Sequence, residues 1–182
     1  MPLKPPEMDL LLAKVKVKKA LLSVLLLYCG MTVIAQQDTT PPYKRYPSFP
    51  PVDLVQLNNQ PLTKKDIPTG KASLVFYFSP DCDHCQHQVK DMLPRMKEFE
   101  KVHILMVTHQ PIDMLQKFYS EYNLNRYRNI QVGRDAKFLL PPFYKIRSLP
   151  YLALYDKKGR LIRTFEGNVK VDVLLKAYNN NL

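Results

Sequence analysis

An apolar run that leads into a Cys-x-x-Cys pair constrains this chain most. The residues from Leu74 to Phe78 are aliphatic or aromatic, which predicts a buried strand. Pro80 ends the strand, and Asp81 can cap a following helix. Cys82 is therefore expected near the first helical position, with Cys85 one turn later on the same face.

That placement predicts thiol chemistry. Cys82 should be the more exposed sulfur, and the free N–H groups and dipole of the first helical turn favour its thiolate, the species that attacks a disulfide. Cys85 is close enough to resolve the resulting mixed disulfide. His84 lies between the two cysteines and, when charged, stabilises the Cys82 anion, which makes the couple more oxidising.

Three other uses of the pair are weighed. A zinc site could use both cysteines with His84 and His87, but structural zinc usually needs a second ligand pair further along the chain. Attachment of c-type haem needs His directly after the second Cys, where Gln86 stands. A structural disulfide closing so short a loop would restrain the unfolded chain little. The pattern therefore favours redox chemistry over metal or structural use.

Length and composition predict a single globular domain. The chain has 182 residues, of which 46% are hydrophobic, so it can bury a proper core. The formal net charge is +11, and a solvated basic surface is the favoured interpretation. No aromatic-basic motif of a nucleic-acid-binding module is present, so we expect no nucleic-acid partner.

Residues 1–35 are expected to be a secretory signal peptide. Lys14 to Lys19 form a basic segment, Ala20 to Ile34 form an apolar run, and cleavage is expected after Ala35. The apolar run is short for a membrane span, so an uncleaved anchor is the second choice and no stable insertion is expected after cleavage. Lipidation of Cys29 is disfavoured because the bulky Tyr28 precedes it.

Export fits the cysteine usage. Removal of the signal peptide removes Cys29 and leaves only Cys82 and Cys85, and exported compartments tolerate disulfides. The predicted location is the periplasm or cell envelope.

The remaining chain divides into an extended lead-in over 36–51 and one domain over 52–182. Hydrophobic periodicity and turn residues predict its further elements. We expect strands at 52–57, 103–108, 129–132, 151–155 and 160–165, and helices at 82–99 (kinked at Pro94), 112–122 and 171–178, with 135–144 helical in part and broken by Pro141-Pro142.

This order resembles the thioredoxin fold, an α/β fold with a central mixed β-sheet flanked by helices. Within that superfamily the chain is similar to the exported TlpA/ResA-like thiol-disulfide oxidoreductases over about residues 50 to 180. The similarity rests on the stretch from Phe76 to Cys85, on Leu149-Pro150 before a strand, and on the hairpin from Asp156 to Arg160. The resemblance implies that Pro150 is cis, faces the cysteines, and exposes the backbone of Leu149 for pairing with a substrate segment.

The chain departs from its relatives at informative positions. Phe76 stands where thioredoxin-like strands often carry a buried acid, and Gln88 where TlpA/ResA-like proteins often carry Glu. The usual proton acceptor for Cys85 is therefore missing. His84 in the third motif position resembles the DsbA type, but Pro150 follows too soon for the large helical insertion of that family. Peroxiredoxins need a Pro that Val75 replaces, and their resolving-Cys spacing differs.

The sequence thus predicts an exported enzyme that exchanges disulfides with protein substrates. The expected site consists of Cys82, Cys85 and His84, with Leu149 and Pro150 binding substrate. No cofactor or metal is expected beyond the redox-active Cys82–Cys85 disulfide, and a membrane or periplasmic protein would donate electrons. Reductive work in cytochrome c maturation is typical of the resemblance. Oxidation or isomerisation of the DsbA type, or non-enzymatic copper handling, are the alternatives.

Overall fold

The computed structural model describes residue 14 and residues 16–19 and 40–179. It falls into two units, Met1–Thr39 and Thr40–Leu182. In the first unit the five described residues are helical, and the rest of the expected signal peptide, with Cys29 and the cleavage site, lies outside the described residues. Within the described part of the chain, every helix is too short or too polar to cross a membrane.

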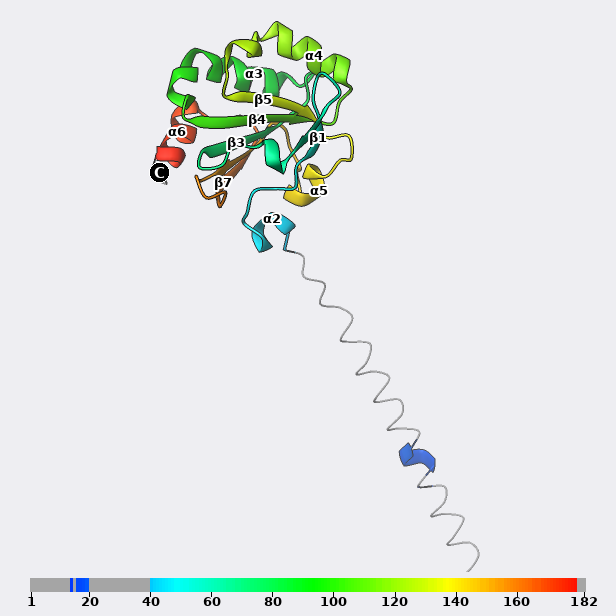
Figure 1. The fold of residues 1–182 in the computed structure, drawn as a ribbon. Coiled ribbons are helices and arrows are strands. Elements are labelled where there is room, and N and C mark those ends of the chain that lie inside the picture. Colours follow the sequence, from blue (N-terminus) through cyan, green and yellow to red (C-terminus); the bar gives the residue numbers. More distant parts are fainter. Residues whose placement is uncertain (1–13, 15, 20–39, 180–182) are drawn as a thin grey trace, which may run out of the picture. The chain divides into compact units, whose positions relative to one another are not determined.

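The second unit is built on one mixed seven-stranded sheet (Figure 1). Its strands are β1 (Asp53–Val55), β2 (Pro61–Thr63), β3 (Ala72–Tyr77), β4 (Val102–Thr108), β5 (Ile130–Arg134), β6 (Tyr151–Tyr155) and β7 (Leu161–Glu166). They lie in the order β2-β1-β5-β4-β3-β6-β7. The three central strands β3, β4 and β5 are parallel, and the outer strands are antiparallel to their neighbours.

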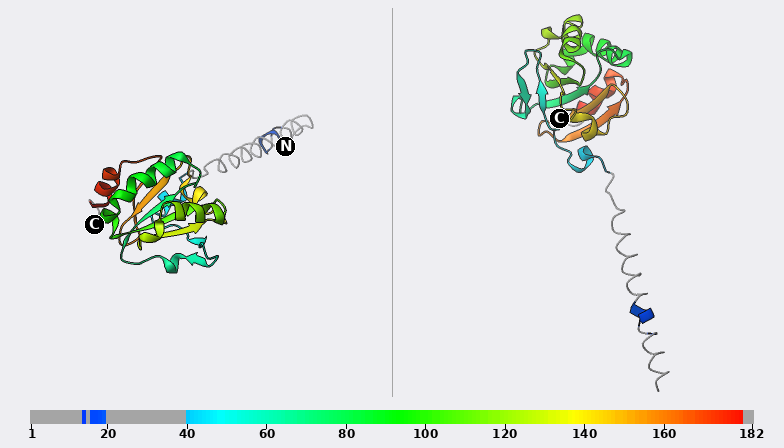
Figure 2. Two further views of the ribbon diagram at one scale, coloured as in Figure 1. Left: turned by 90° about the horizontal axis from the view of Figure 1, so that it is seen from above. Right: turned by 90° about the vertical axis from the view of Figure 1, so that its right-hand side faces the viewer.

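Helices cover both faces of the sheet (Figures 1 and 2). They are α2 (Pro42–Arg45), η2 (Lys64–Asp66), α3 (Asp83–Met92), η3 (Leu93–Phe99), α4 (Ile112–Glu121), η4 (Leu124–Arg126), α5 (Leu140–Tyr144) and α6 (Val171–Asn179), where η marks a 3₁₀ helix. Side chains of α3, α4 and α6 pack on one face, and α5 with residues of the lead-in packs on the other. This arrangement confirms the expected thioredoxin fold.

Strand β3 forms the centre of the core because all six of its residues are buried. Leu74 and Phe76 face the layer that contains α3, while Val75 and Tyr77 face the layer that contains α5. Alternation of this kind follows from the two-residue period of a strand. A run that is apolar on both faces is what a central strand between two helical layers requires.

The helix after the cysteines ends earlier than predicted. We expected one kinked helix to Phe99, but α3 ends at Met92 and a 3₁₀ helix continues the chain from Leu93 to Phe99. Pro94 lies in the first turn of that segment, where a missing N–H costs no intrahelical hydrogen bond. The proline therefore divides two helical segments instead of bending a single one.

Three further elements differ from the prediction. The lead-in contains the short helix α2, and its Tyr43 ring packs on Tyr144 with centroids 5.8 Å apart. The strand expected at 52–57 is shorter and forms a hairpin with β2, which was not predicted. Pro141 and Pro142 do not break α5 but lie in its first turn, a position that tolerates proline.

Candidate functional site

The two cysteines lie at the end of β3, where the chain enters α3. Cys82 is the N-cap residue of α3 and is partly exposed, one position earlier than predicted. We expected Asp81 to cap the helix, but it does not. Its carboxylate instead accepts a hydrogen bond from the Ser79 hydroxyl. The Cys82 N–H donates to the Ser79 carbonyl at 3.1 Å, which closes the turn between strand and helix.

Cys85 lies inside the fold beneath Cys82. Both are free cysteines, and Cys85 has no exposed surface. Burial is the main cause that raises the pKa of the Cys85 thiol, and a hydrogen bond to the Cys82 side chain raises it further. The Ser79 backbone N–H lowers the pKa of the Cys85 thiol by stabilising its thiolate. The negative charges of Cys82 and Asp81 raise the pKa further. The arrangement pairs one accessible sulfur with one enclosed sulfur, as predicted.

The raised pKa predicts slow alkylation of Cys85 in the folded protein. In the variant Cys82→Ser, burial remains, so Cys85 should react with iodoacetamide only at a pH higher than a free thiol requires. Mass spectrometry of the peptide that contains Cys85 measures its rate at each pH, and the urea-unfolded chain provides the reference. Equal rates in the folded and unfolded chains across the pH range would contradict the prediction.

The Leu149–Pro150 peptide bond is cis, as the resemblance implies. In the antiparallel register of β3 and β6, Tyr77 lies opposite Tyr151, so the residues next to them, Phe78 and Pro150, also lie side by side. The cis proline therefore lies beside the loop that carries the cysteines. Among residues 40–179, neither the N–H nor the carbonyl of Leu149 has a hydrogen-bond partner, and its half-buried side chain packs against both core layers.

The segment between β7 and α6 joins the cysteine helix to the proline loop, which sequence reasoning missed. The Gly167 N–H donates to the Pro150 carbonyl at 2.8 Å, and Asn168 Nδ2 donates to the His84 carbonyl at 2.7 Å. The fully buried Gln88 side chain donates to the Val169 carbonyl at 3.0 Å and accepts from the Val169 N–H at 2.7 Å. Nothing in the sequence near Gln88 or Val169 indicated that the two residues pair.

His84 lies on the exposed side of α3, between the cysteines in sequence. Its carbonyl holds the Asn168 contact, and its imidazole is open to solvent. His87, the other histidine of the helix, faces Asp91 at 3.4 Å. Within the described part of the chain, no three His, Cys, Asp or Glu side chains come together as a metal site would require, which gives no support to zinc or copper binding.

A polar network connects the cysteine loop to the ends of the two neighbouring parallel strands. Gln110 Nε2 donates to the Ser79 hydroxyl at 3.1 Å, and the Gln110 N–H donates to the Thr108 hydroxyl at 3.2 Å. The Asp135 N–H donates to the Thr108 carbonyl at 2.7 Å. The loops after β3, β4 and β5 are thus linked at one edge of the sheet, as expected where parallel strands end.

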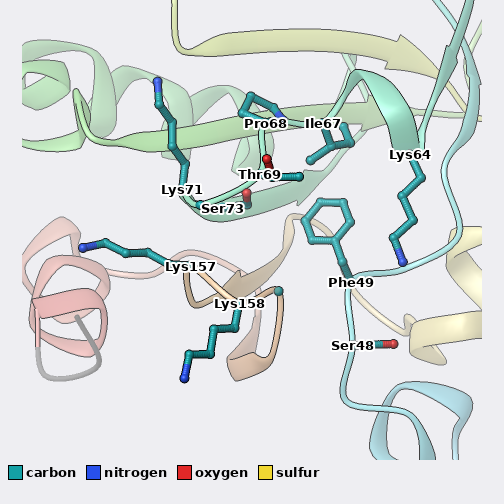
Figure 3. A pocket seen from close by; sticks show the side chains of 12 residues that line it. Ser48, Phe49, Lys64, Ile67, Pro68, Thr69, Lys71, Ser73, Lys157 and Lys158 are labelled. Atoms are coloured by element: carbon teal, nitrogen blue, oxygen red, sulfur yellow. The ribbon is translucent and has the colours of Figure 1, made fainter.

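A separate hollow of about 260 Å³ lies at the other end of β3 (Figure 3). Ser73 near the start of the strand lines it, whereas the cysteines follow the end of the strand. The side chains of Lys71, Lys157 and Lys158 extend from it in different directions in Figure 3, so their charges do not converge on one point. The hollow is therefore not part of the cysteine site.

Comparison with known proteins shows the family to which this chain belongs. The AhpC/TSA family matches residues 47–176, which is most of the chain, and the protein belongs to that family. No curated protein matches the chain.

Solved structures show the same fold at low sequence identity. A thiol:disulfide interchange protein of the thioredoxin family from Chlorobium tepidum is 16% identical with a TM-score of 0.62, covering 80% of this chain and 99% of its own. A secreted Mycobacterium tuberculosis disulfide oxidoreductase homologous to E. coli DsbE is 18% identical with a TM-score of 0.58, covering 69% and 92%. A peroxiredoxin-like protein from Aquifex aeolicus is 15% identical with a TM-score of 0.59, covering 74% and 85%. The likeness to these structures establishes the shared fold.

Proposed function

We propose that this protein is an exported thiol-disulfide oxidoreductase that exchanges disulfides with protein substrates. One observation carries the proposal: a partly exposed Cys82 is in contact with a buried Cys85 beside the cis Leu149–Pro150 bond. Thiol exchange needs one sulfur that a substrate can reach. It also needs a second sulfur that can attack the resulting mixed disulfide and release the substrate. Family membership and the names of the solved relatives, which include a thiol:disulfide interchange protein and a disulfide oxidoreductase, support the same class.

In the reducing direction, the Cys82 thiolate attacks a substrate disulfide. A Cys82–substrate bond forms, the substrate S–S bond breaks, and the first substrate thiolate leaves and takes a proton. Cys85 then loses its proton and attacks the Cys82 sulfur, which forms the Cys82–Cys85 disulfide and releases the second substrate thiolate. The substrate gains two electrons and the protein dithiol loses two. The same steps in reverse oxidise a substrate dithiol.

The neighbouring groups have supporting roles in this proposal. Cys82 at the N-cap of α3 is the sulfur that the substrate reaches, the exposed His84 lies beside it in the first turn, and the backbone groups of Leu149 pair with an extended substrate segment. The redox-active Cys82–Cys85 disulfide needs no other cofactor. The second sulfur lies one turn from the first and in contact with it, which suits exchange with protein disulfides better than peroxide chemistry.

The cellular setting is inferred from the sequence and the relatives. Residues 1–35 act as a signal peptide that directs the protein to the periplasm or cell envelope, and a solved relative is described as secreted. A membrane or periplasmic protein supplies the electrons. We propose reduction, as in cytochrome c maturation, as the direction in the cell, with oxidation or isomerisation as the alternative.

The function is tested by insulin reduction followed as turbidity with dithiothreitol as electron source. The wild-type protein should shorten the lag before the insulin chains precipitate, and Cys82→Ser, produced without residues 1–35, should leave the lag as in buffer alone, because its remaining thiol, Cys85, is buried. A parallel series with EDTA or added copper separates this activity from metal handling. A wild-type protein that does not shorten the lag, or that does so only with copper, would contradict the proposal.

A further inference from the structure

Phe138 is a large apolar residue that is exposed to solvent at the end of the sheet where the cysteine loop lies. It lies in the loop between β5 and α5, drawn yellow in Figure 1, and its side chain is 51% exposed. Its backbone has a φ of 53°, in the left-handed region that favours glycine and asparagine and penalises bulky side chains. A single exposed hydrophobic residue is ordinary. One that also occupies an unfavourable backbone conformation requires a cause.

The surrounding loop forces this conformation. The carboxylate of Asp135, which is 1% exposed, accepts hydrogen bonds from the N–H groups of Leu139 and Leu140, both at 2.9 Å. The Phe138 N–H donates to the Asp135 carbonyl at 3.2 Å. These contacts bind the residues on both sides of Phe138, so the turn does not depend on the Phe138 side chain. Asparagine would fit the same backbone with less strain, so the turn itself gives no reason for phenylalanine.

The Phe138 ring instead stands against His109, another exposed residue. The two rings are 5.5 Å apart at 88°, an edge-to-face contact. The His109 carbonyl accepts a hydrogen bond from Arg134 at 3.4 Å, and Gln110, the next residue, donates to Ser79 in the cysteine loop. The aromatic pair is thus continuous with the loop that carries Cys82. Both rings therefore lie at the end of the sheet where the parallel strands finish and where the cysteine loop begins.

We propose that the Phe138–His109 pair binds an apolar side chain that lies close to the reacting cysteine in the partner polypeptide. The inference rests on the proposed function, because a polypeptide bound to Cys82 can extend from the cysteine loop over the neighbouring ends of β4 and β5, where the pair lies. Aromatic anchors are the residues that most often dominate such contacts. The occupant is a segment of the protein substrate with an aromatic or large aliphatic residue near its cysteine. Small disulfides such as oxidised glutathione cannot use the contact.

The test compares two synthetic peptides that each contain one internal disulfide and differ only in carrying phenylalanine or serine beside the first cysteine. Wild-type protein should reduce the phenylalanine peptide about tenfold faster than the serine peptide. Phe138→Asn should remove this preference, leave the rate with oxidised glutathione unchanged, and leave the melting temperature equal or higher because the asparagine suits the backbone. Tyr46→Asn, which removes an exposed aromatic residue of the lead-in, is the matched control and should keep the preference.

The outcomes separate this inference from the proposed function. Failure of the wild-type protein to exchange with either peptide or with glutathione would refute the function and the inference together. Exchange with both peptides but no preference, or a preference that survives in Phe138→Asn, would refute the inference alone. Equal slowing of all three substrates together with a lower melting temperature would show that Phe138 only supports the loop, and would also overturn the inference.

Discussion

Cys85→Ser is expected to accumulate mixed disulfides between Cys82 and substrate proteins. The substitution leaves Cys82 at the N-cap of α3 and removes the buried sulfur that contacts it. External thiols at millimolar concentration must then resolve the complex, whereas an oriented intramolecular thiol acts as if it were far more concentrated. Turnover in the insulin assay should therefore fall roughly 100-fold or more. Non-reducing electrophoresis of the purified protein after incubation with oxidised insulin detects the adduct as a reducible band.

Cys82→Ser is the matched control because it keeps one cysteine of the pair, Cys85, which a substrate cannot reach. Cys85 is fully buried, so this variant should form no adduct under the same conditions. Adducts at Cys85 in the control, or free turnover by Cys85→Ser at the wild-type rate, would overturn the assignment of nucleophile and resolving thiol. Seryl hydroxyls are close in size to thiols, so neither variant is expected to disturb the helix.

The sequence predicted the parts of the fold whose causes are local. The apolar run at β3 and the proline before β6 fix a strand–turn–helix unit and a strand start, and both were found where expected. Pro94 illustrates the limit of such reasoning. A proline inside a helical pattern signals an interruption, but whether the chain bends or changes to a 3₁₀ helix depends on the packing of Met96 and Phe99 into the core.

The unpredicted features depend on contacts between segments far apart in the chain. The pairing of Gln88 with Val169 joins α3 to the segment just after β7, 81 residues along the chain, and no pattern near either residue indicates it. The hairpin of β1 and β2 was also not predictable, because β2 has only three residues and one buried side chain, Leu62, which is too short a pattern to indicate a strand. Asp81 was assigned as a cap from its position alone, whereas the Ser79 hydroxyl competes for the carboxylate.

These contacts also explain what replaces the missing carboxylates. Phe76 packs against Phe78, with ring centroids 5.5 Å apart, where thioredoxin-like strands often carry an acid. Gln88 stands where TlpA/ResA-like proteins often carry Glu. Its side-chain amide both donates to and accepts from the backbone of Val169. An amide can donate and accept at once, and an ionised carboxylate can only accept. In this chain Gln88 therefore joins the cysteine helix to the segment that hydrogen-bonds to Pro150. The chain consequently lacks a carboxylate at this position that could accept the proton of Cys85.

Gln88→Met should destabilise the protein by about 2–6 kcal/mol, because both backbone groups of Val169 lose a buried partner and each costs about 1–3 kcal/mol when left unpaired. Urea unfolding followed by circular dichroism measures the change. Gln116→Met on the exposed face of α4 is the matched control, since the side chain there is in solvent and hydrogen-bonds to the exposed Ser120, and its effect should stay within about 0.5 kcal/mol. Equal unfolding free energies for the two variants would contradict the joining role of Gln88.

Gln88→Glu should show a pH dependence that the methionine variant lacks. Burial raises the pKa of a carboxyl at this position above its value in the unfolded chain, so the folded variant binds a proton more tightly than the unfolded one. At neutral pH the carboxylate can still accept from the Val169 N–H but faces the Val169 carbonyl without a donor. As the pH falls toward about 4, the usual range for a free glutamate, the acid gains a proton and can donate again. The difference in unfolding free energy from wild type should therefore shrink on acidification, and a difference independent of pH would show that the side chain at position 88 turns away from Val169.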